Sequence, residues 1–154
     1  MCNQNLLKMK FEKVFEVKWA DVDQNKHVRH SAYYDYGAYV RVRFFTEHGY
    51  GAQQFDEIGL GPILFKEVCH FIKEIGPDDT VRVNILKGEI NEDASRWTLH
   101  HEIFNQDELK VAHITGTGAW MDTGKRKLTA PPPDLAEALH DLPPGEEYVY
   151  KREG

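Results

Sequence analysis

The sequence predicts an α+β domain, in which a curved antiparallel sheet of about five strands wraps around one long central helix. Three observations lead to this class: a run with helical spacing near residues 31–47, one strand-like run before it, and four strand-like runs after it. Short turns join the later runs, which is typical of antiparallel pairing. The 154 residues fit a single domain, 1–154, with its core at about 10–130 and a short helix and tail at 131–154.

The first strand and the helix follow each other closely. Residues 11–22 alternate approximately between apolar and polar, with Trp19 on the apolar side, which predicts a half-buried strand. The helix is expected from about Ser31 to about Glu47, because Gly49 can take the left-handed conformation that ends helices. Its apolar positions recur at the spacing of one helical face: Tyr33, Tyr36, Gly37, Val40 and Phe44. A wide apolar surface of this kind predicts an enclosed helix.

The later strands form one continuous series. They are expected at 63–75, 80–90, 95–105 and 108–122, with turn residues between them. Consecutive strands joined by short turns predict a meander, and Gly116 and Gly118 predict a close approach or a bulge in the last strand. A strongly curved sheet leaves exposed edges, so we expect two such sheets to pair edge to edge in a homodimer. A short helix that begins near Asp134 is expected to pack on the surface.

Composition excludes several classes of protein. Apolar residues make up 41% of the chain and charged residues 29%, a globular balance, and the net charge of −6 makes nucleic acid an unsuitable partner. No run of about 18 apolar residues predicts a membrane span, and the first residues lack the apolar segment of a secretory signal. Cys2 and Cys69 have no metal-binding or redox spacing. We therefore expect a cytoplasmic location.

The stretch at residues 19–41, "WADVDQNKHVRHSAYYDYGAYVR", carries a recognisable motif. It resembles the opening motif of hotdog-fold acyl-CoA thioesterases of the 4-hydroxybenzoyl-CoA thioesterase type. Looser similarity extends over about residues 10–130, and the resemblance implies the hotdog fold. The matching positions are the paired aspartates Asp21 and Asp23, the pair His27-Val28, the histidine His30 of a related branch, and the helix tyrosines Tyr33 and Tyr36.

The stretch departs from the family pattern in three ways. Lys26 stands where the family has a glycine, and Arg29-His30 replaces a pair of asparagines. The acidic residue often found on the helix after the second tyrosine is absent, since residues 37–39 read Gly-Ala-Tyr. The departures leave the identity of the acyl group open.

Thioester hydrolysis needs a base or nucleophile at the carbonyl carbon and donors for the developing oxyanion. The resemblance implies that Asp23 is the nucleophile or the general base, and both roles stay open. The alternative is that Asp23 caps a turn. The first N–H groups of the helix, near His30 or Ser31, lack partners within the helix and lie at its positive dipole end, so one of them can hold the oxyanion.

We therefore predict Asp23 and His30 as catalytic residues. The predicted substrate-binding residues are His27, Arg29, Ser31 and Tyr33. Two of them have a structural alternative: His27 can pack under the helix start, and Tyr33 can belong to the core. Asp21 is interpreted as an ion-pair partner of Arg29 or Lys26. A metal held by the histidines and aspartates of this stretch is disfavoured, because the spacing lacks an established zinc pattern, so no metal or cofactor is predicted.

Two other clusters of titratable residues are weaker candidates for a functional site. His100 and His101 point to opposite faces of one strand, so we expect one to pack on the helix and the other to face solvent. The basic turn at residues 123–127 either contacts the phosphates of coenzyme A or is simply solvated.

The predicted function is hydrolysis of an acyl-CoA, with a short-chain or aromatic acyl group, to the free acid and CoA. The expected assembly is a homodimer or homotetramer with the pocket between subunits, and acyl-CoA is the expected ligand. The main alternative is a non-catalytic hotdog protein that binds an acyl or aromatic ligand. A hotdog dehydratase is disfavoured, because it would need the carboxylate that is missing from the helix.

Overall fold

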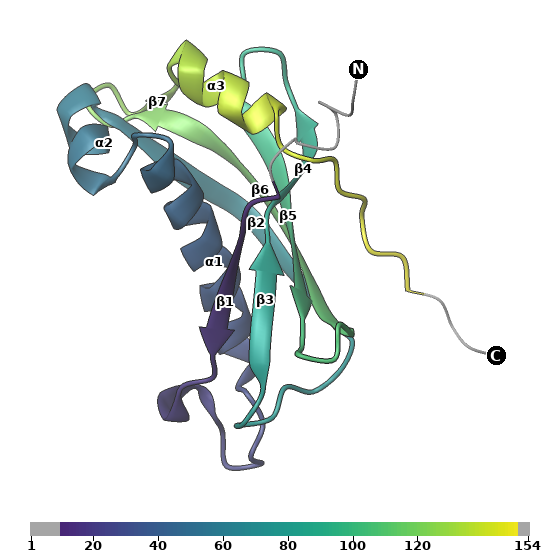
Figure 1. The fold of residues 1–154 in the computed structure, drawn as a ribbon. Helices are drawn as coiled ribbons and strands as arrows, with labels where there is room; N and C mark the ends of the chain where they lie inside the picture. The colour runs from purple at the N-terminus through teal and green to yellow at the C-terminus, as the bar shows by residue number, and fades with distance from the viewer. Residues whose placement is uncertain (1–9, 151–154) are drawn as a thin grey trace, which may run out of the picture.

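The computed structural model describes residues 10–150, so Cys2 lies outside the described residues. One long α-helix, two short α-helices, one 3-10 helix and seven strands make up this part of the chain (Figure 1). The elements, in order, are β1 (Glu12–Glu16), the short 3-10 helix η1 (Trp19–Asp21), α1 (His30–Glu47), α2 (Ala52–Ile58), β2 (Leu60–Phe71), β3 (Thr80–Asn84), β4 (Leu86–Ile90), β5 (Arg96–Phe104), β6 (Lys110–Asp122), β7 (Lys127–Leu128) and α3 (Pro133–His140).

All seven strands belong to one antiparallel sheet that curves around α1, so the predicted α+β architecture is confirmed (Figure 1). The main order is β1-β3-β5-β6-β2, with β4 beside β5 and β7 beside β6. The prediction of a simple meander is wrong for β2, which pairs with β6 from Leu60↔Asp122 to Phe71↔Ala112. It cannot lie beside β3, because β1 and β5 occupy both sides of that strand.

Two expected strand boundaries also need correction. The strand expected at 80–90 is divided into β3 and β4 at Ile85, whose N–H bonds to the carbonyl of Phe11 instead of continuing the ladder with β5. The strand expected at 11–22 ends at Glu16, and a 3-10 turn follows it. The side chain of Trp19 in this turn is 93% exposed, so its predicted place on the buried side of a strand is wrong.

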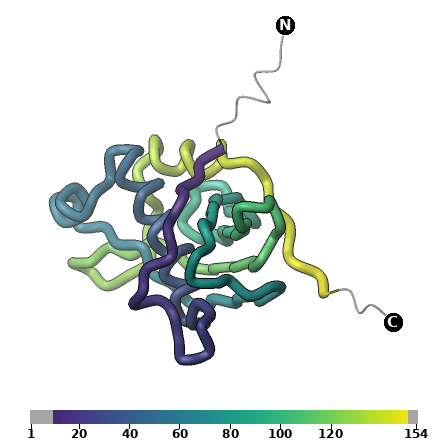
Figure 2. Tube along the Cα trace, turned by 60° about the horizontal axis from the view of Figure 1, so that its bottom comes forward, coloured from purple at the N-terminus to yellow at the C-terminus, as the bar shows by residue number. Residues whose placement is uncertain are grey.

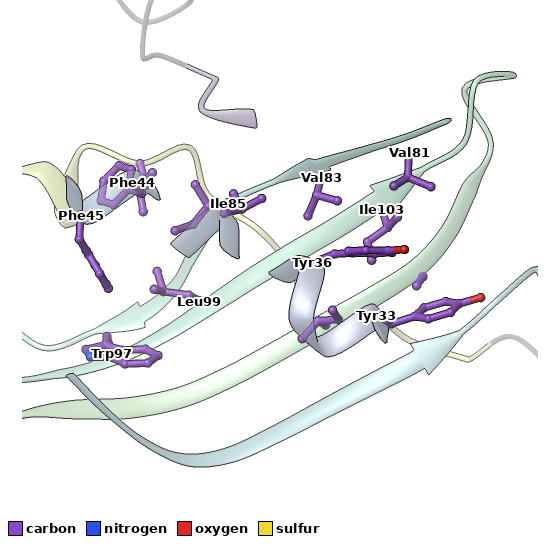
Figure 3. Close-up of a cluster of buried hydrophobic side chains, with 14 of the residues drawn as sticks. Tyr33, Tyr36, Phe44, Phe45, Val81, Val83, Ile85, Trp97, Leu99 and Ile103 are labelled. Atoms are coloured by element: carbon purple, nitrogen blue, oxygen red, sulfur yellow. The ribbon is translucent and has the colours of Figure 1, made fainter. Parts of the chain in front are cut away.

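The apolar stripe of α1 faces the concave side of the sheet, as predicted. All five stripe positions are buried, and Figure 3 shows several of their side chains against strand residues such as Val83 and Ile103. Gly37 lets the helix approach the sheet closely, since a Cβ there would lie 3.1 Å from the His101 ring and 3.2 Å from Ile114 Cδ1. Gly49 has φ +92°, which confirms the predicted left-handed end of the helix.

The C-terminal helix α3 packs against the rest of the fold, whereas Val149 and Tyr150 near the end of the described residues are exposed. Leu135 and Leu139 of α3 are fully buried, which confirms the packing role expected for this helix. The segment that follows, residues 143–150, passes along the side of the sheet away from α2 (Figure 2). It covers His100, which lies 3.1 Å from His113, so the expectation that one histidine of the His100-His101 pair faces solvent is wrong. None of the helices in residues 10–150 is long and apolar enough to cross a membrane.

Candidate active site

The loop before α1 is fixed to the end of the sheet by backbone hydrogen bonds. Val22 and Val28 form an isolated antiparallel bridge, and Val28 N–H bonds to the Ile75 carbonyl at 2.8 Å. Arg29 N–H bonds to the Asp21 carbonyl at 2.7 Å. Because these bonds hold both arms of the loop, the residues between them and the first turn of α1 have a defined position.

The side chain of Asp21 connects this loop to α1. Its carboxylate accepts a hydrogen bond from the Tyr36 hydroxyl at 3.0 Å and lies 3.5 Å from Arg29 Nη2, which confirms the predicted ion pair. Figure 3 shows the hydroxyl of Tyr36 pointing to the same end of the sheet as that of Tyr33. Burial, together with the negative charge of Asp21, raises the pKa of Tyr36. Asp21 therefore has a structural role, and its carboxylate is already engaged.

Asp23 lies in a tight turn at the exposed end of the loop. Its Oδ1 accepts hydrogen bonds from the N–H groups of Asn25 at 2.8 Å and His27 at 3.4 Å, while Lys26 takes φ 62° in the same turn. The turn-capping role considered for Asp23 is thus present. No hydrogen bond or ion pair within residues 10–150 uses its second oxygen, Oδ2. One oxygen holds the turn, and the other is free for a substrate or a water molecule.

The first turn of α1 presents unused donors beside this loop. Arg29 is the N-cap residue and makes no side-chain cap, and no described residue accepts a hydrogen bond from the N–H of His30 or Ser31. The positive end of the helix dipole lies at these two amides. Arg29 adds a full positive charge there and donates from Nη1 to the Ser31 hydroxyl. These donors and charges favour the binding of an anionic oxygen at the start of α1.

The remaining predicted residues separate into two groups. His30 is exposed at the first position of the helix, and His27 pairs through Nε2 with Glu74 Oε2 at 3.1 Å. Tyr33 is buried, its ring lies 4.9 Å from that of Phe71, and burial raises its pKa. The structure therefore gathers Asp23, His27, Arg29, His30 and Ser31 at one end of the sheet, with Tyr33 in the wall behind them.

Two features at this end of the fold were not predicted as parts of the site. Glu74, the partner of His27, comes from the segment after β2, far away in the sequence. Trp19, four residues before Asp23, exposes an aromatic ring next to the loop. No three histidine, cysteine or carboxylate side chains converge on a possible metal position anywhere in residues 10–150.

Comparison with known proteins identifies the family of this chain. A family model for the thioesterase-like superfamily matches residues 17–139, which include the loop, α1 and the whole sheet except β1. The chain belongs to the thioesterase-like superfamily. The narrower resemblance to the 4-hydroxybenzoyl-CoA thioesterase type stays a prediction.

Solved structures are similar to this thioesterase-like protein over most of its chain. A Staphylococcus aureus protein solved in complex with CoA is 15% identical, with a TM-score of 0.83 over 92% of this chain and 90% of that one. A 1,4-dihydroxy-2-naphthoyl-CoA thioesterase from Synechocystis is 18% identical, with a TM-score of 0.77 over 87% and 98% of the two chains. These similarities confirm the hotdog fold.

One relative is also found by sequence. An Aquifex aeolicus protein provisionally named an esterase is 24% identical over 125 residues, which span 81% of this chain and 94% of that protein. The match covers nearly the full length of the relative.

Proposed function

We propose that this protein is an acyl-CoA thioesterase that uses Asp23 to hydrolyse the thioester. The observation that carries the proposal is the pair of unpartnered N–H groups at His30 and Ser31, beside a loop whose Asp23 has one free carboxylate oxygen. Membership of the thioesterase-like superfamily supports the reaction class. The S. aureus neighbour solved with CoA supports the ligand class.

In the proposed reaction the thioester carbonyl lies between Asp23 and the start of α1. Asp23 Oδ2 either takes a proton from water, whose oxygen then adds to the carbonyl carbon, or attacks that carbon itself to form an anhydride that water opens. The amides of His30 and Ser31 hold the carbonyl oxygen as it becomes negative. The carbon–sulfur bond breaks, and His30 relays a proton of the attacking water to the departing thiolate. The products are the free acid and CoA.

We further propose that the active form is a homodimer joined through β2. This strand lies on a free edge of the sheet, and its exposed apolar side chains include Leu64 at 45% and Phe65 at 56%. A free, apolar edge strand is a template for pairing with another chain. Antiparallel pairing of two β2 strands would bury these side chains and close the open side of α1 with a second subunit. A cytoplasmic location, where acyl-CoA is available, fits this role.

A non-catalytic acyl-CoA-binding protein is the second candidate. The hydrogen bonds from the N–H groups of Asn25 and His27 to Asp23 favour it, because they give this carboxylate a structural reason to be present. In that case the electropositive start of α1 would bind the ligand without any chemistry.

Thiol release from a panel of acyl-CoAs separates these two candidates. The thioesterase should show saturable release of CoA with at least one short-chain or aromatic acyl group, and Asp23→Ala should abolish it. Glu89→Gln is the control, because it changes an exposed carboxylate of β4 that the proposed reaction does not use. Tight binding of the panel with no release by the unmodified protein would favour the binding protein.

A further inference from the structure

Two buried histidines lie on the face of the sheet that is turned away from α1, and the proposed reaction does not use them. His101 of β5 packs against Gly37 of α1, so its neighbour His100 points to the other face. There, His100 Nδ1 lies 3.1 Å from Nε2 of His113 on β6. His100 and His113, the histidine pair, are each only 2% exposed. The pair is therefore a titratable group that the fold keeps away from water.

The hydrogen-bonding needs of the histidine pair are not fully met. His100 Nδ1 also lies 3.0 Å from the hydroxyl oxygen of Thr115. His113 Nδ1, in contrast, is buried and has no hydrogen-bond partner among residues 10–150. A buried polar atom without a partner calls for an explanation, because nothing offsets the loss of its contact with water. Water would satisfy this atom if the segment that covers the pair moved away.

The segment that covers the pair is the C-terminal strap, which consists of residues 143–150 (Figure 2). Gly145 lies against His100, since a Cβ there would be 3.1 Å from the His100 ring. The centroid of the Tyr148 ring lies 6.1 Å from that of His113 and 4.9 Å from that of His70. The strap therefore contacts or borders both members of the histidine pair.

Few interactions attach the strap to the sheet. Gly145 donates its N–H to the Lys87 carbonyl at 2.8 Å, and the Lys87 N–H bonds to the Pro143 carbonyl at 2.9 Å. Within the described part of the chain, no hydrogen bond or ion pair holds residues 146–150. Cavities of about 180 and 450 Å³ flank Tyr148. Segments with few hydrogen bonds and loose packing open at a lower free energy than the core, so the strap can open while the sheet stays folded.

The surroundings of the pair keep it neutral while the strap is closed. Burial lowers the pKa of His100, although Glu147 and Glu102 oppose the shift. Burial, with the charge of Lys110, lowers the pKa of His113 to about 4. Glu102 attracts a proton only weakly, because its Oε2 is paired with Lys110 Nζ at 2.8 Å. The groups that surround the pair are Lys66 and His70 of β2, Glu102 of β5, Lys110 of β6, Glu146, Glu147 and Tyr148 of the strap, and the uncharged Leu86 and Gly88 of β4.

We propose that the C-terminal strap is an acid-sensitive latch, which opens more often when a proton binds to the histidine pair. In the open form the imidazoles reach water and regain their ordinary pKa of about 6.5. Below that pH the open form binds more protons than the closed form, so acid favours opening. For His113 alone, a pKa of about 4 in the closed form makes opening ~20-fold more frequent at pH 5 than at pH 7. The latch does not depend on the proposed hydrolysis.

Hydrogen exchange of single amides, followed by NMR, tests the latch. The N–H groups of Gly145 and Lys87 join the strap to β4, so their protection from exchange reports how often the strap opens. The N–H of Ile114, on a strand that is paired on both sides, reports unfolding of the sheet. After correction for the intrinsic exchange rates, Gly145 should be less protected than Ile114 at pH 5 and at pH 7. Its protection should fall ~20-fold from pH 7 to pH 5.

Variants of His113 assign this fall to the histidine pair. His113→Phe and His113→Gln both remove the titratable ring, and in either folded variant the fall at Gly145 should shrink below about fivefold, with His100 as the remaining group. Ile114 should stay pH-dependent, because the buried His101 is still present. The control His48→Gln, at the end of α1, should keep the ~20-fold fall. A fall of unchanged size in the His113 variants, no fall in the unmodified protein, or equal protection of Gly145 and Ile114 would overturn the latch.

Discussion

Alanine at position 118 should destabilise the fold far more than alanine at position 116. A Cβ on Gly118 would lie 2.2 Å from the Ile63 carbonyl oxygen and 2.5 Å from the Trp97 ring, whereas ordinary contacts between heavy atoms are about 3.5–4 Å. Neither obstacle can move easily, because Ile63 belongs to the adjacent strand and Trp97 is buried. The strands would have to separate by more than about 1 Å, so we expect a loss of ~3 kcal/mol or more.

Gly116→Ala is the matched control on the same strand. The nearest atom to its Cβ would be the flexible end of Leu64, at 3.3 Å, and the other neighbours lie at 3.7 Å or more, so the contact can relax. Replacing glycine with alanine also restricts the unfolded chain, which stabilises by about 0.4–1 kcal/mol where the backbone allows it. Urea unfolding followed by tryptophan fluorescence measures both free energies, and a 3 kcal/mol loss shifts the midpoint by ~1–3 M. Equal midpoints for the two variants would refute the argument.

Two more predictions concern pH and assembly. Burial lowers the pKa of His101 to about 3 and that of His113 to about 4. Both stay neutral in the fold while the unfolded chain binds protons below about pH 6.5, so stability should fall by roughly 2–4 kcal/mol from pH 7 to pH 5. Urea midpoints that do not change over this range would contradict buried, neutral histidines. For assembly, light scattering should give a molar mass of twice the 17.8 kDa of one chain. Phe65→Lys should reduce this mass to that of a single chain, whereas the control Val149→Lys, at another exposed apolar position, should leave it unchanged. A single-chain mass for the unmodified protein would contradict dimerisation through β2.

Local patterns predicted the helix well, because its evidence lies within one run of residues. The stripe from Tyr33 to Phe44 and the left-handed Gly49 needed no knowledge of distant partners. Strand order was harder, since β2 could pair with any neighbour of suitable length. Its place beside β6 depends on contacts between residues that are far apart in the sequence, such as Leu60 and Asp122, which are 62 positions apart.

The site was predictable only where its parts are close in sequence. The loop and the start of α1 lie within residues 19–31, so the motif indicated them together. Glu74 beside His27 comes from the segment after β2, and no spacing in the sequence signals such a pair. His100 was misplaced for the same reason, because the segment that covers it follows more than 40 residues later.

The contribution of Asp23 to kcat tests the central claim most directly. With the best acyl-CoA of the panel, Asp23→Asn should lower kcat by ~100-fold or more while KM changes little, because a general base or nucleophile acts on the reacting carbonyl. Urea unfolding of the same variant should show that it is folded. A folded Asp23→Asn variant with kcat within threefold of the unmodified protein would contradict the account.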